Sequence, residues 1–447
     1  MKTTTTIIQL IFACMVFFTV SSCKKDSLQS NQFNAAQFDS AIARDWFSLQ
    51  RTLIKETPGF SPPVAARSFG YAGITLYESV YQSMSGFQSL ETKINGLEEN
   101  TITKIDASKT YHWGLVANAA MADIYRNLFK TASGQNLLRI DAMEASYVIK
   151  FKNSVSQDVL DLSVSYGKQI AKEIYAYSQT DGQDEAYKTN FPAYIPVVGP
   201  GKWIPTGDNK TPLQPYWGSV RPFITTNISL SQPPPPPTYS TAPTSKFYSE
   251  ANEVYNTARN LTSSQKDIAD YWSDDPGKTS TPSGHIFYIA TLVLEKERAD
   301  LPKAAEVYAK LGIAINDAFI SCWKCKFEHN LIRPVSYIQQ VIDPNFTTFL
   351  STPPFPEYTS GHSVQSGAGF TVLSEIFGYN YAFSDFANYG RTDINGSPRN
   401  FTSFQDAANQ AAISRLYGGI HYRAAIERGL EQGQRIGSNT MVHIQMK

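Results

Sequence analysis

Residues 322–338 read CWKCKFEHNLIRPVSYI, residues 355–362 read FPEYTSGH, and residues 414–421 read SRLYGGIH. These stretches, in this order, occupy the last third of the chain and carry basic side chains and histidines. An arginine offers a fork of N–H donors that matches paired oxygens, and a lysine adds a compact positive charge. Lys326, Arg333 and Arg415 can together neutralise a multiply charged anion. His362 and His421 can then act as acid, base or nucleophile, so the stretches predict a catalytic site for a tetrahedral oxyanion.

The first two motifs occupy positions at which a helix favours an anion. Lys326 and Arg333 are about two helical turns apart, so we expect both on one face of a helix that ends before Pro334. Ser360-Gly361-His362 precedes a helical stretch. A helix N-terminus offers free backbone N–H groups and the positive end of the helix dipole, and glycine allows close approach of an anion to the backbone.

The third motif needs a break in the chain between its two functional side chains. Arg415 and His421 are too far apart in sequence to share one helical face, and Gly418-Gly419 permits a break. We expect Arg415 at the end of one helix and His421 at the start of the next. Pro282-Ser283-Gly284-His285 matches the middle motif a second time, but it is out of order, and we expect it to cap a helix that starts near His285.

The order and spacing of the motifs resemble the signature of the superfamily shared by type 2 phosphatidic acid phosphatases, bacterial acid phosphatases and vanadium-dependent haloperoxidases. In that signature Lys, six residues and Arg-Pro come first, then Pro-Ser-Gly-His, then Ser-Arg, five residues, His, three residues and Asp. Two positions depart from it: Thr359 precedes Ser360 in place of proline, and Ala425 stands in place of the final aspartate. In the family this aspartate orients the second histidine. Glu427 is no obvious replacement, because it lies about 240° around a helix from His421. A backbone carbonyl could take over the orienting bond, and the sequence leaves open which group does so.

The resemblance implies an all-α fold, a large helical bundle of the haloperoxidase and acid phosphatase type, and one of two reactions. In a phosphatase, His421 would attack phosphorus and carry the phosphoryl group while His362 protonates the leaving oxygen. In a haloperoxidase, vanadate takes the phosphate position, His421 is its metal ligand, and Lys326 and His362 are catalytic with it. The residues expected to bind the vanadate oxygens are Lys326, Arg333, Ser360, Gly361 and Arg415.

The residues around the motifs favour the haloperoxidase reaction. Residues 322–338 and 355–362 are similar to bacterial vanadium haloperoxidases of the iodide-oxidising type, and simple acid phosphatases of the superfamily are about half as long. We therefore expect an enzyme that uses hydrogen peroxide to oxidise iodide, with bromide as the second candidate, to hypohalous acid. Trp323 and Phe355 are candidates for the halide pocket, although ordinary packing explains them equally well. Two alternatives stay open: a lipid-anchored acid phosphatase with a phosphohistidine intermediate, and a non-catalytic anion-binding lipoprotein, which Ala425 favours.

The N-terminus predicts export and a lipid anchor. An apolar run from Ile7 to Val20 leads to Val20-Ser21-Ser22-Cys23, which resembles a bacterial lipobox. We expect residues 1–22 to be a signal peptide, Cys23 to be lipidated, and residues 23–35 to form a tether. This places the protein in the cell envelope, with Lys24 indicating the outer membrane, or outside the cell. The 39 basic and 39 acidic residues balance, so nucleic acid is excluded as a partner and the membrane is reached through the anchor alone.

Cys322 and Cys325 form a Cys-Trp-Lys-Cys pair immediately before Lys326. A redox motif would need a strand-to-helix context and a zinc site would need two further ligands. The sequence offers neither, so we expect a local disulfide or two packed thiols.

Apolar residues recur at helical spacing along most of the chain, which predicts a single helical domain over residues 36–447 with the anion site within 320–430. The sequence shows no sustained alternation of apolar and polar residues, so it predicts no sheet. The span 190–245 is rich in proline, and we expect it to be an extended loop without helices. A second irregular stretch is expected at 380–401. The helices are expected within residues 38–53, 62–82, 110–131, 136–153, 159–174, 246–274, 285–299, 307–319, 362–378 and 406–440.

Overall fold

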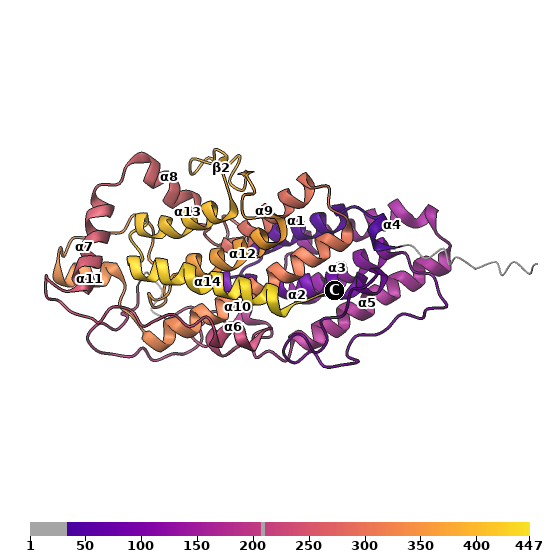
Figure 1. The fold of residues 1–447 in the computed structure, drawn as a ribbon, viewed down its shortest axis with the longest axis horizontal. Helices are drawn as coiled ribbons and strands as arrows, with labels where there is room; N and C mark the ends of the chain where they lie inside the picture. Colours follow the sequence, from indigo (N-terminus) through magenta and orange to yellow (C-terminus); the bar gives the residue numbers. More distant parts are fainter. Residues whose placement is uncertain (1–33, 207–210) are drawn as a thin grey trace, which may run out of the picture.

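Helices dominate the computed structural model, which describes residues 34–206 and 211–447 (Figure 1). The predicted all-α bundle is confirmed. The described residues include one small antiparallel sheet, formed by β1 (Phe383–Asp385) and β2 (Arg399–Phe401). The helices longer than one turn of 3-10 helix are α1 (Ala41–Glu56), α2 (Pro62–Val80), α3 (Trp113–Leu128), α4 (Gly134–Phe151), α5 (Gln157–Ser178), α6 (Thr225–Ser229), α7 (Lys246–Arg259), α8 (Ser263–Tyr271), α9 (Thr281–Lys296), α10 (Leu301–His329), α11 (Pro334–Val341), α12 (Gly361–Phe377), α13 (Phe404–Tyr417) and α14 (Arg423–His443).

Helix α10 forms the middle of the bundle. It is 29 residues long and buried over most of its length, and it packs against both α2 and α12. Figure 1 shows α2, α3 and α5 toward one end of the elongated molecule and α7 and α11 toward the other. A helix that is buried over most of its length lies in the core of a large protein, and α10 thereby joins the N-terminal helices to those that carry the motifs.

Two helix contacts near the core are close enough to require glycine. A Cβ at Gly73 of α2 would lie 2.4 Å from the carbonyl oxygen of Tyr308 in α10, and a Cβ at Gly433 of α14 would lie 2.0 Å from the carbonyl oxygen of Val364 in α12. Because neither position tolerates a side chain, these glycines set the distance between the helices. The second contact holds α14 against the helix that follows the Ser-Gly-His motif.

The expectation that residues 190–245 hold no helix is wrong, because α6 lies within them. No proline interrupts residues 223–232. Asp317, buried in α10, accepts hydrogen bonds from the backbone N–H of Phe223 at 2.8 Å and from the side chain of Asn227 at 2.9 Å. These bonds fix the start of the short helix, whereas most of the remaining excursion is irregular as expected.

Three other elements differ from the expectations. The helix expected over 246–274 is divided into α7 and α8, because Thr262 caps α8 in a reciprocal capping box with Gln265. Helix α11 was not anticipated, since its eight residues are too few for a clear repeat. The strands β1 and β2 lie in the stretch expected to be irregular, and three residues each are too few to show alternation.

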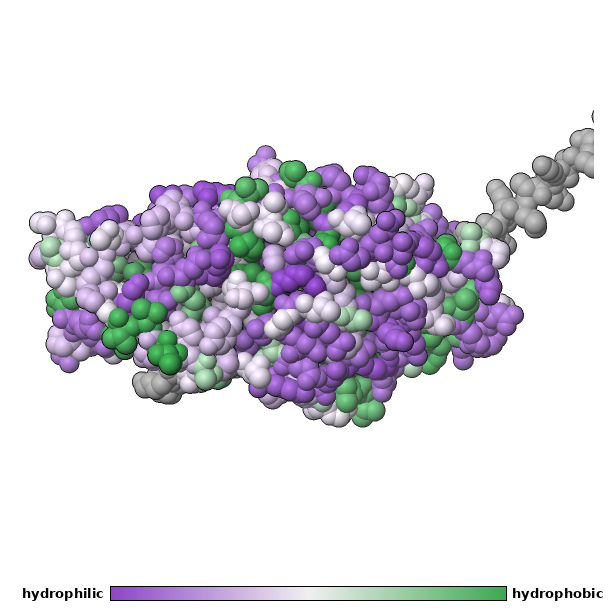
Figure 2. Space-filling view, turned by 90° about the horizontal axis from the view of Figure 1, so that it is seen from below, coloured by the Kyte–Doolittle hydropathy of each residue, from purple (hydrophilic) through white to green (hydrophobic). Residues whose placement is uncertain are grey.

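None of the described helices combines the length and apolar character needed to cross a membrane. On the face drawn in Figure 2, apolar side chains form separate groups among hydrophilic ones. The predicted signal peptide and Cys23 lie outside the described residues. That residues 36–447 form a single domain stays a prediction.

Candidate active site

Each predicted site residue lies at or near a helix end. Helix α10 ends at His329, because Asn330 takes the left-handed conformation with φ of 47°. Lys326 and Arg333 therefore do not share one helical face, and that expectation is wrong. The positions are Lys326 in the last turn of α10, Arg333 as the N-cap of α11, Ser360 as the N-cap of α12, Arg415 in the last turn of α13, and His421 just before α14.

The expected break between Arg415 and His421 is present. Helix α13 ends at Tyr417, and Gly419 adopts a φ of 76° that disfavours any residue with a side chain. The chain then turns back, so that His421 lies in the connection to α14 and faces the same cavity as Arg415.

The ammonium group of Lys326 is buried and surrounded by carbonyl groups. Its Nζ donates to the backbone oxygens of Pro356 at 3.1 Å, Glu357 at 3.1 Å and Thr359 at 2.5 Å. An ammonium group has three N–H donors, so these bonds use all of them. Burial lowers the pKa of Lys326 to about 8. Lys326 thus fixes the backbone ahead of Ser360 and supplies positive charge from behind the site.

The guanidinium of Arg333 lies next to the second histidine. Its Nε donates to the backbone oxygen of Phe355 and its Nη1 to that of Ile420, both at 2.9 Å. The same Nη1 lies 3.2 Å from Nε2 of His421. Nη2 is buried without a hydrogen-bond partner among the described residues. Burial lowers the pKa of Arg333 to about 10, so this cation would gain from an anion close to it.

A carboxylate orients His421. Oε1 of Glu357 accepts from Nδ1 of His421 and from the backbone N–H of Tyr422, each at 2.9 Å, and both side chains are buried. Burial raises the pKa of Glu357 to about 8, although Arg333 and Lys326 oppose this shift. Arginine can only donate, so the contact of Arg333 Nη1 with Nε2 of His421 places the lone pair on Nε2 and the proton on Nδ1. Burial lowers the pKa of His421 well below its ordinary value, and Arg333 and Lys326 lower it further. His421 is therefore a neutral imidazole with Nε2 available as a ligand or nucleophile.

A side-chain carboxyl group, and not a backbone carbonyl, therefore stands in for the family aspartate. Ala425 contributes differently, since its carbonyl oxygen accepts from the backbone N–H of Ser360 at 3.1 Å. Glu427 forms an exposed ion pair with Arg423, as its position on the helix leads one to expect. Glu357, which belongs to a segment far from His421 in the sequence, performs the orienting role.

His362 and Arg415 approach the same loop from two helices. Arg415 Nη1 donates to the backbone oxygen of Trp272 at 3.0 Å, and the backbone of Trp272 and Ser273 also contacts the imidazole of His362. Nε2 of His362 and Nε of Arg415 are buried without partners among the described residues. Burial lowers the pKa of His362 well below its ordinary value, with Arg415 adding to the effect. Burial also lowers the pKa of Arg415, to about 10.

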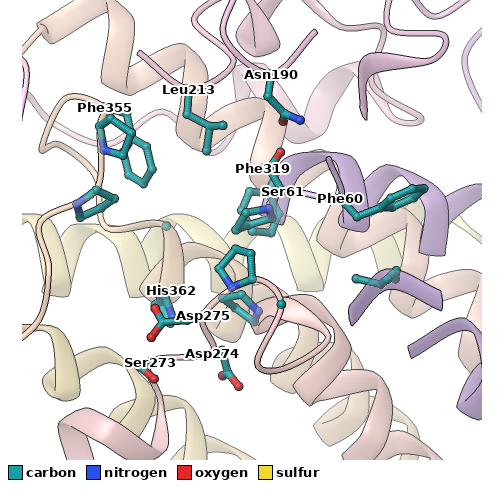
Figure 3. A pocket seen from close by; sticks show the side chains of 18 of the residues that line it. Phe60, Ser61, Asn190, Leu213, Ser273, Asp274, Asp275, Phe319, Phe355 and His362 are labelled. Carbon is teal, nitrogen blue, oxygen red and sulfur yellow. The ribbon is translucent and has the colours of Figure 1, made fainter. Parts of the chain in front are cut away.

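A cavity of about 590 Å³ opens onto these groups. Gly361, His362, Arg415 and His421 line it, and Figure 3 shows His362 with Ser273 and Asp275 across the cavity from Phe355 and Leu213. Trp323 and Phe355, whose rings pack 5.0 Å apart, also line the cavity. The side chain of Trp323 is held by a hydrogen bond from Nε1 to the carbonyl oxygen of Leu213 at 3.2 Å. The cavity thus has a basic end and a largely apolar wall.

The fold and the sequence are similar to those of a solved enzyme. A crystal structure described as that of the first bacterial vanadium-dependent iodoperoxidase superposes with a TM-score of 0.81 and 36% sequence identity, over 92% of this chain and 97% of that one. This chain belongs to the vanadium-dependent haloperoxidases. The family expected from the motifs is confirmed.

More distant comparisons agree with this haloperoxidase fold. Holo and apo structures of a bacterial vanadium-dependent chloroperoxidase superpose with TM-scores of 0.65 at 16% and 15% identity, over 87% of this chain and 95% and 94% of theirs. The family profile of the VCPO second helical-bundle domain matches residues 339–447. That match includes the second and third motifs and leaves out Lys326 and Arg333. A search of curated proteins finds no match.

The site of this haloperoxidase fits a vanadate anion. Three buried nitrogens of the predicted anion-site residues lack partners among the described residues: Nη2 of Arg333, Nε of Arg415 and Nε2 of His362. None of Lys326, Arg333 and Arg415 forms a direct ion pair among the described residues, although the carboxyl groups of Glu357, Asp274 and Asp275 lie nearby. Buried cations need paired anions, and an oxyanion would satisfy both the charge and the donors.

Two other expectations concern residues outside the anion site. The second Pro-Ser-Gly-His match does not cap a helix: α9 begins at Thr281, so His285 lies in its first turns, between two aspartates. Cys322 and Cys325 are two buried free thiols, which decides between the two outcomes expected for them. The sequence reasoning missed Glu357, although it stands three residues ahead of Ser360 as a carboxylate within a conspicuous motif.

Proposed function

We propose that this haloperoxidase binds vanadate through His421 and oxidises iodide with hydrogen peroxide to hypoiodous acid. The observation that carries the proposal is the 36% identity to a bacterial iodoperoxidase over 92% of the chain. The neutral, carboxylate-oriented imidazole of His421 and the unused donors beside it support the assignment of the site. Bromide is the second candidate halide.

His421 would hold vanadium through Nε2, the nitrogen that Glu357 leaves unprotonated. Arg333 Nη1 now lies 3.2 Å from that nitrogen, so the guanidinium has to turn toward the oxygens of the anion when the ligand enters. Arg333 and Arg415 would bind those oxygens, with Ser360 and Gly361 at the start of α12. Lys326 acts by its charge while its donors stay on backbone carbonyls.

Bound vanadate supplies a Lewis acid that makes peroxide electrophilic toward the halide. His362 manages protons in this reaction. Its lowered pKa keeps the imidazole neutral, and its Nε2 faces the cavity without a partner among the described residues. It can take a proton from hydrogen peroxide and return it to the leaving oxygen.

The apolar wall favours iodide among the halides. Trp323 and Phe355 replace water around an anion that approaches the basic end of the cavity. The cost of removing an ion from water falls as its radius grows, so iodide, the largest common halide, loses least. We therefore propose that Trp323 and Phe355 form part of the halide pocket.

Purified protein with and without orthovanadate, given hydrogen peroxide and iodide, tests the proposal. We expect triiodide to form only after vanadate is added, and His421→Ala to abolish the reaction. A phosphomonoester in a parallel assay tests the acid phosphatase alternative. Phosphate release without vanadate-dependent iodide oxidation would overturn the proposal. Absence of both activities would favour a binding protein, although the Glu357–His421 pair removes the argument that Ala425 gave for it.

We further propose that Cys23 is lipidated and anchors the enzyme in the cell envelope, in the outer membrane. The support is the sequence Val20-Ser21-Ser22-Cys23 followed by Lys24. Metabolic labelling with a fatty acid should mark the wild-type protein and not Cys23→Ser. If the wild-type protein incorporates no fatty acid and is found in the medium, the enzyme is secreted and not anchored.

A further inference from the structure

Another buried histidine, His285, lies between two aspartates, of which Asp274 also lines the cavity of the anion site. Nδ1 of His285 in α9 is 2.9 Å from Oδ2 of Asp274, and Nε2 is 2.7 Å from Oδ2 of Asp385 in β1. All three side chains are almost completely buried. Burial alone would lower the pKa of His285, but the two aspartates overcome this effect and raise it to about 10. Both ring nitrogens donate, so the triad holds an imidazolium at neutral pH.

The triad adjoins the loop that contacts Arg415 and His362. The ring of Trp272 stacks on the imidazole of His285, with centroids 4.5 Å apart and planes at 17°. The carbonyl oxygen of Trp272 accepts from Arg415, and the backbone of Trp272 and Ser273 contacts His362. Figure 3 shows Ser273 close to His362 at the cavity. One short segment therefore lies between the triad and two residues of the site.

The triad restrains a segment whose backbone is in an uncommon conformation. Asp274 has a φ of 49°, which is uncommon for a residue with a side chain, although aspartate adopts it more readily than most residues. The ion pair with His285 supplies that restraint. On the other side, the hydroxyl of Tyr271 donates to the backbone oxygen of Asp385 at 3.1 Å, and the side chain of Asn388 donates to the backbone oxygen of Tyr271 at 2.8 Å.

The charged and titratable neighbours of His285 come from four elements. Asp274 and Asp385 bind it directly, Tyr271 of α8 lies 5.7 Å away between ring centroids, and the charge of His285 lowers the pKa of His362 in α12. The guanidinium carbon of Arg399 in β2 lies 4.7 Å from the ring centroid of Tyr271. The aspartates are the only direct ionic partners of His285 among the described residues.

We propose that the Asp274–His285–Asp385 triad is a positioning element of the active site: it fixes the Trp272–Asp274 backbone, which in turn orients Arg415 and His362. This inference rests on the proposed anion site but concerns residues outside the family motifs. It also gives the second Pro-Ser-Gly-His match a role, since His285 is its last residue.

Asp385→Asn and Asp274→Asn in the full-length protein test the proposal. Each removes one charge while leaving an amide oxygen that can accept from the ring. Calorimetric titration with orthovanadate should show affinity reduced about 10- to 100-fold, as for other groups that support a ligand from behind. In the vanadate-loaded enzyme kcat should fall while KM for iodide stays unchanged, because Asp274 lines the cavity on the side of His362, across from Phe355 (Figure 3).

Asp181→Asn is the matched control. It breaks another buried ion pair, that of Asp181 with Arg67 at 2.6 Å, and neither residue lines the cavity. It should lower thermal stability as the triad variants do, yet leave the orthovanadate affinity of the folded protein unchanged. Equal losses of affinity in the control and the triad variants would overturn the positioning role.

A readout without vanadate separates this proposal from the proposed function. The imidazole ¹⁵N shifts of His362 in the vanadate-free protein should change in both triad variants and not in Asp181→Asn. Folded triad variants with wild-type His362 shifts would overturn the proposal. If the wild-type protein does not bind orthovanadate, the proposed function fails and the His362 shifts alone decide the role of the triad.

Discussion

His421 donates from Nδ1 to Oε1 of Glu357 at 2.9 Å, across 64 residues of sequence, and the same oxygen accepts from the backbone N–H of the next residue, Tyr422. The carboxylate thus holds both the ring and the backbone of the second histidine. Lys326 binds the backbone carbonyl of Glu357, which couples the first motif to the third through one residue. A carboxylate that comes from the chain ahead of Ser360 performs the orienting task that the family signature assigns to an aspartate after the histidine.

Glu357→Gln should reduce vanadate affinity or turnover about 10- to 100-fold, the range found when the carboxylate behind a ligating histidine is changed. The amide oxygen can keep the bond to Tyr422, but it stabilises the Nδ1–H tautomer of His421 less well than an ionised carboxylate does. Orthovanadate titration and iodide oxidation measure the two effects. Glu427→Gln is the control, because Glu427 is exposed and pairs with Arg423. Equal behaviour of the two variants would refute the orienting role.

The sequence predicts the helices and the motif residues well because both depend on local chemistry. Apolar repeats reveal α1 and α5 directly, and a Ser-Gly-His stretch at a helix start is visible in the order of residues. Glu357 could not be found in this way. Its partner is 64 residues away, so neither helical spacing nor turn chemistry links them, and the pairing exists only once α12 and α14 pack together.

The error in placing Lys326 and Arg333 has a local cause. No glycine or proline stands between Gly312 and Pro334, so the sequence gives little warning that Asn330 ends the helix in a left-handed conformation. Asparagine tolerates that conformation better than most residues. Lys326 and Arg333 approach His421 through tertiary folding, so the function predicted for them does not depend on a shared helix and stays a prediction.

Arg415→Lys should weaken orthovanadate binding about tenfold or more. The guanidinium uses Nη1 to hold the carbonyl oxygen of Trp272 and keeps Nε buried and free for an anion. A lysine has a single ammonium group, which cannot both hold the carbonyl oxygen of Trp272 and bind the anion. Calorimetric titration of the full-length protein measures the loss. Arg428→Lys, at an exposed pair with Glu431, is the control, and unchanged binding in Arg415→Lys would remove Arg415 from the anion site.

The free energy of unfolding should fall as the pH rises above neutrality. The pKa of His285 is raised from 6.5 to about 10 in the folded protein. A raised pKa means that the imidazolium stabilises the fold fully below pH 6.5, and that this contribution is lost progressively as the pH rises toward 10. The loss is on the order of a few kcal/mol. Denaturant unfolding at several pH values measures it.

His285→Gln should flatten this part of the pH profile, because the substituted amide does not titrate. The variant should also be less stable than the wild type near pH 6, where the imidazolium is fully formed. The two proteins should approach each other in stability near pH 10. A wild-type profile that rises between pH 7 and 10, or a variant with an unchanged slope, would show that another group dominates.

Phe355→Ala should relax the preference for iodide. The ring of Phe355 lies 5.0 Å from Nζ of Lys326 and 4.9 Å from the guanidinium carbon of Arg333, so it shields both cations from water. Removing it admits water, which lowers the advantage of the halide that is cheapest to desolvate. We expect the ratio of kcat/KM for iodide to that for bromide to fall about tenfold, in line with one cation–π contact of about 1 kcal/mol and the lost apolar wall. Phe60→Ala is the control, since Phe60 lines the same cavity but packs on Phe129 and Tyr187. A similar change in both variants would mean that cavity size, and not the cover over the cations, sets the halide preference.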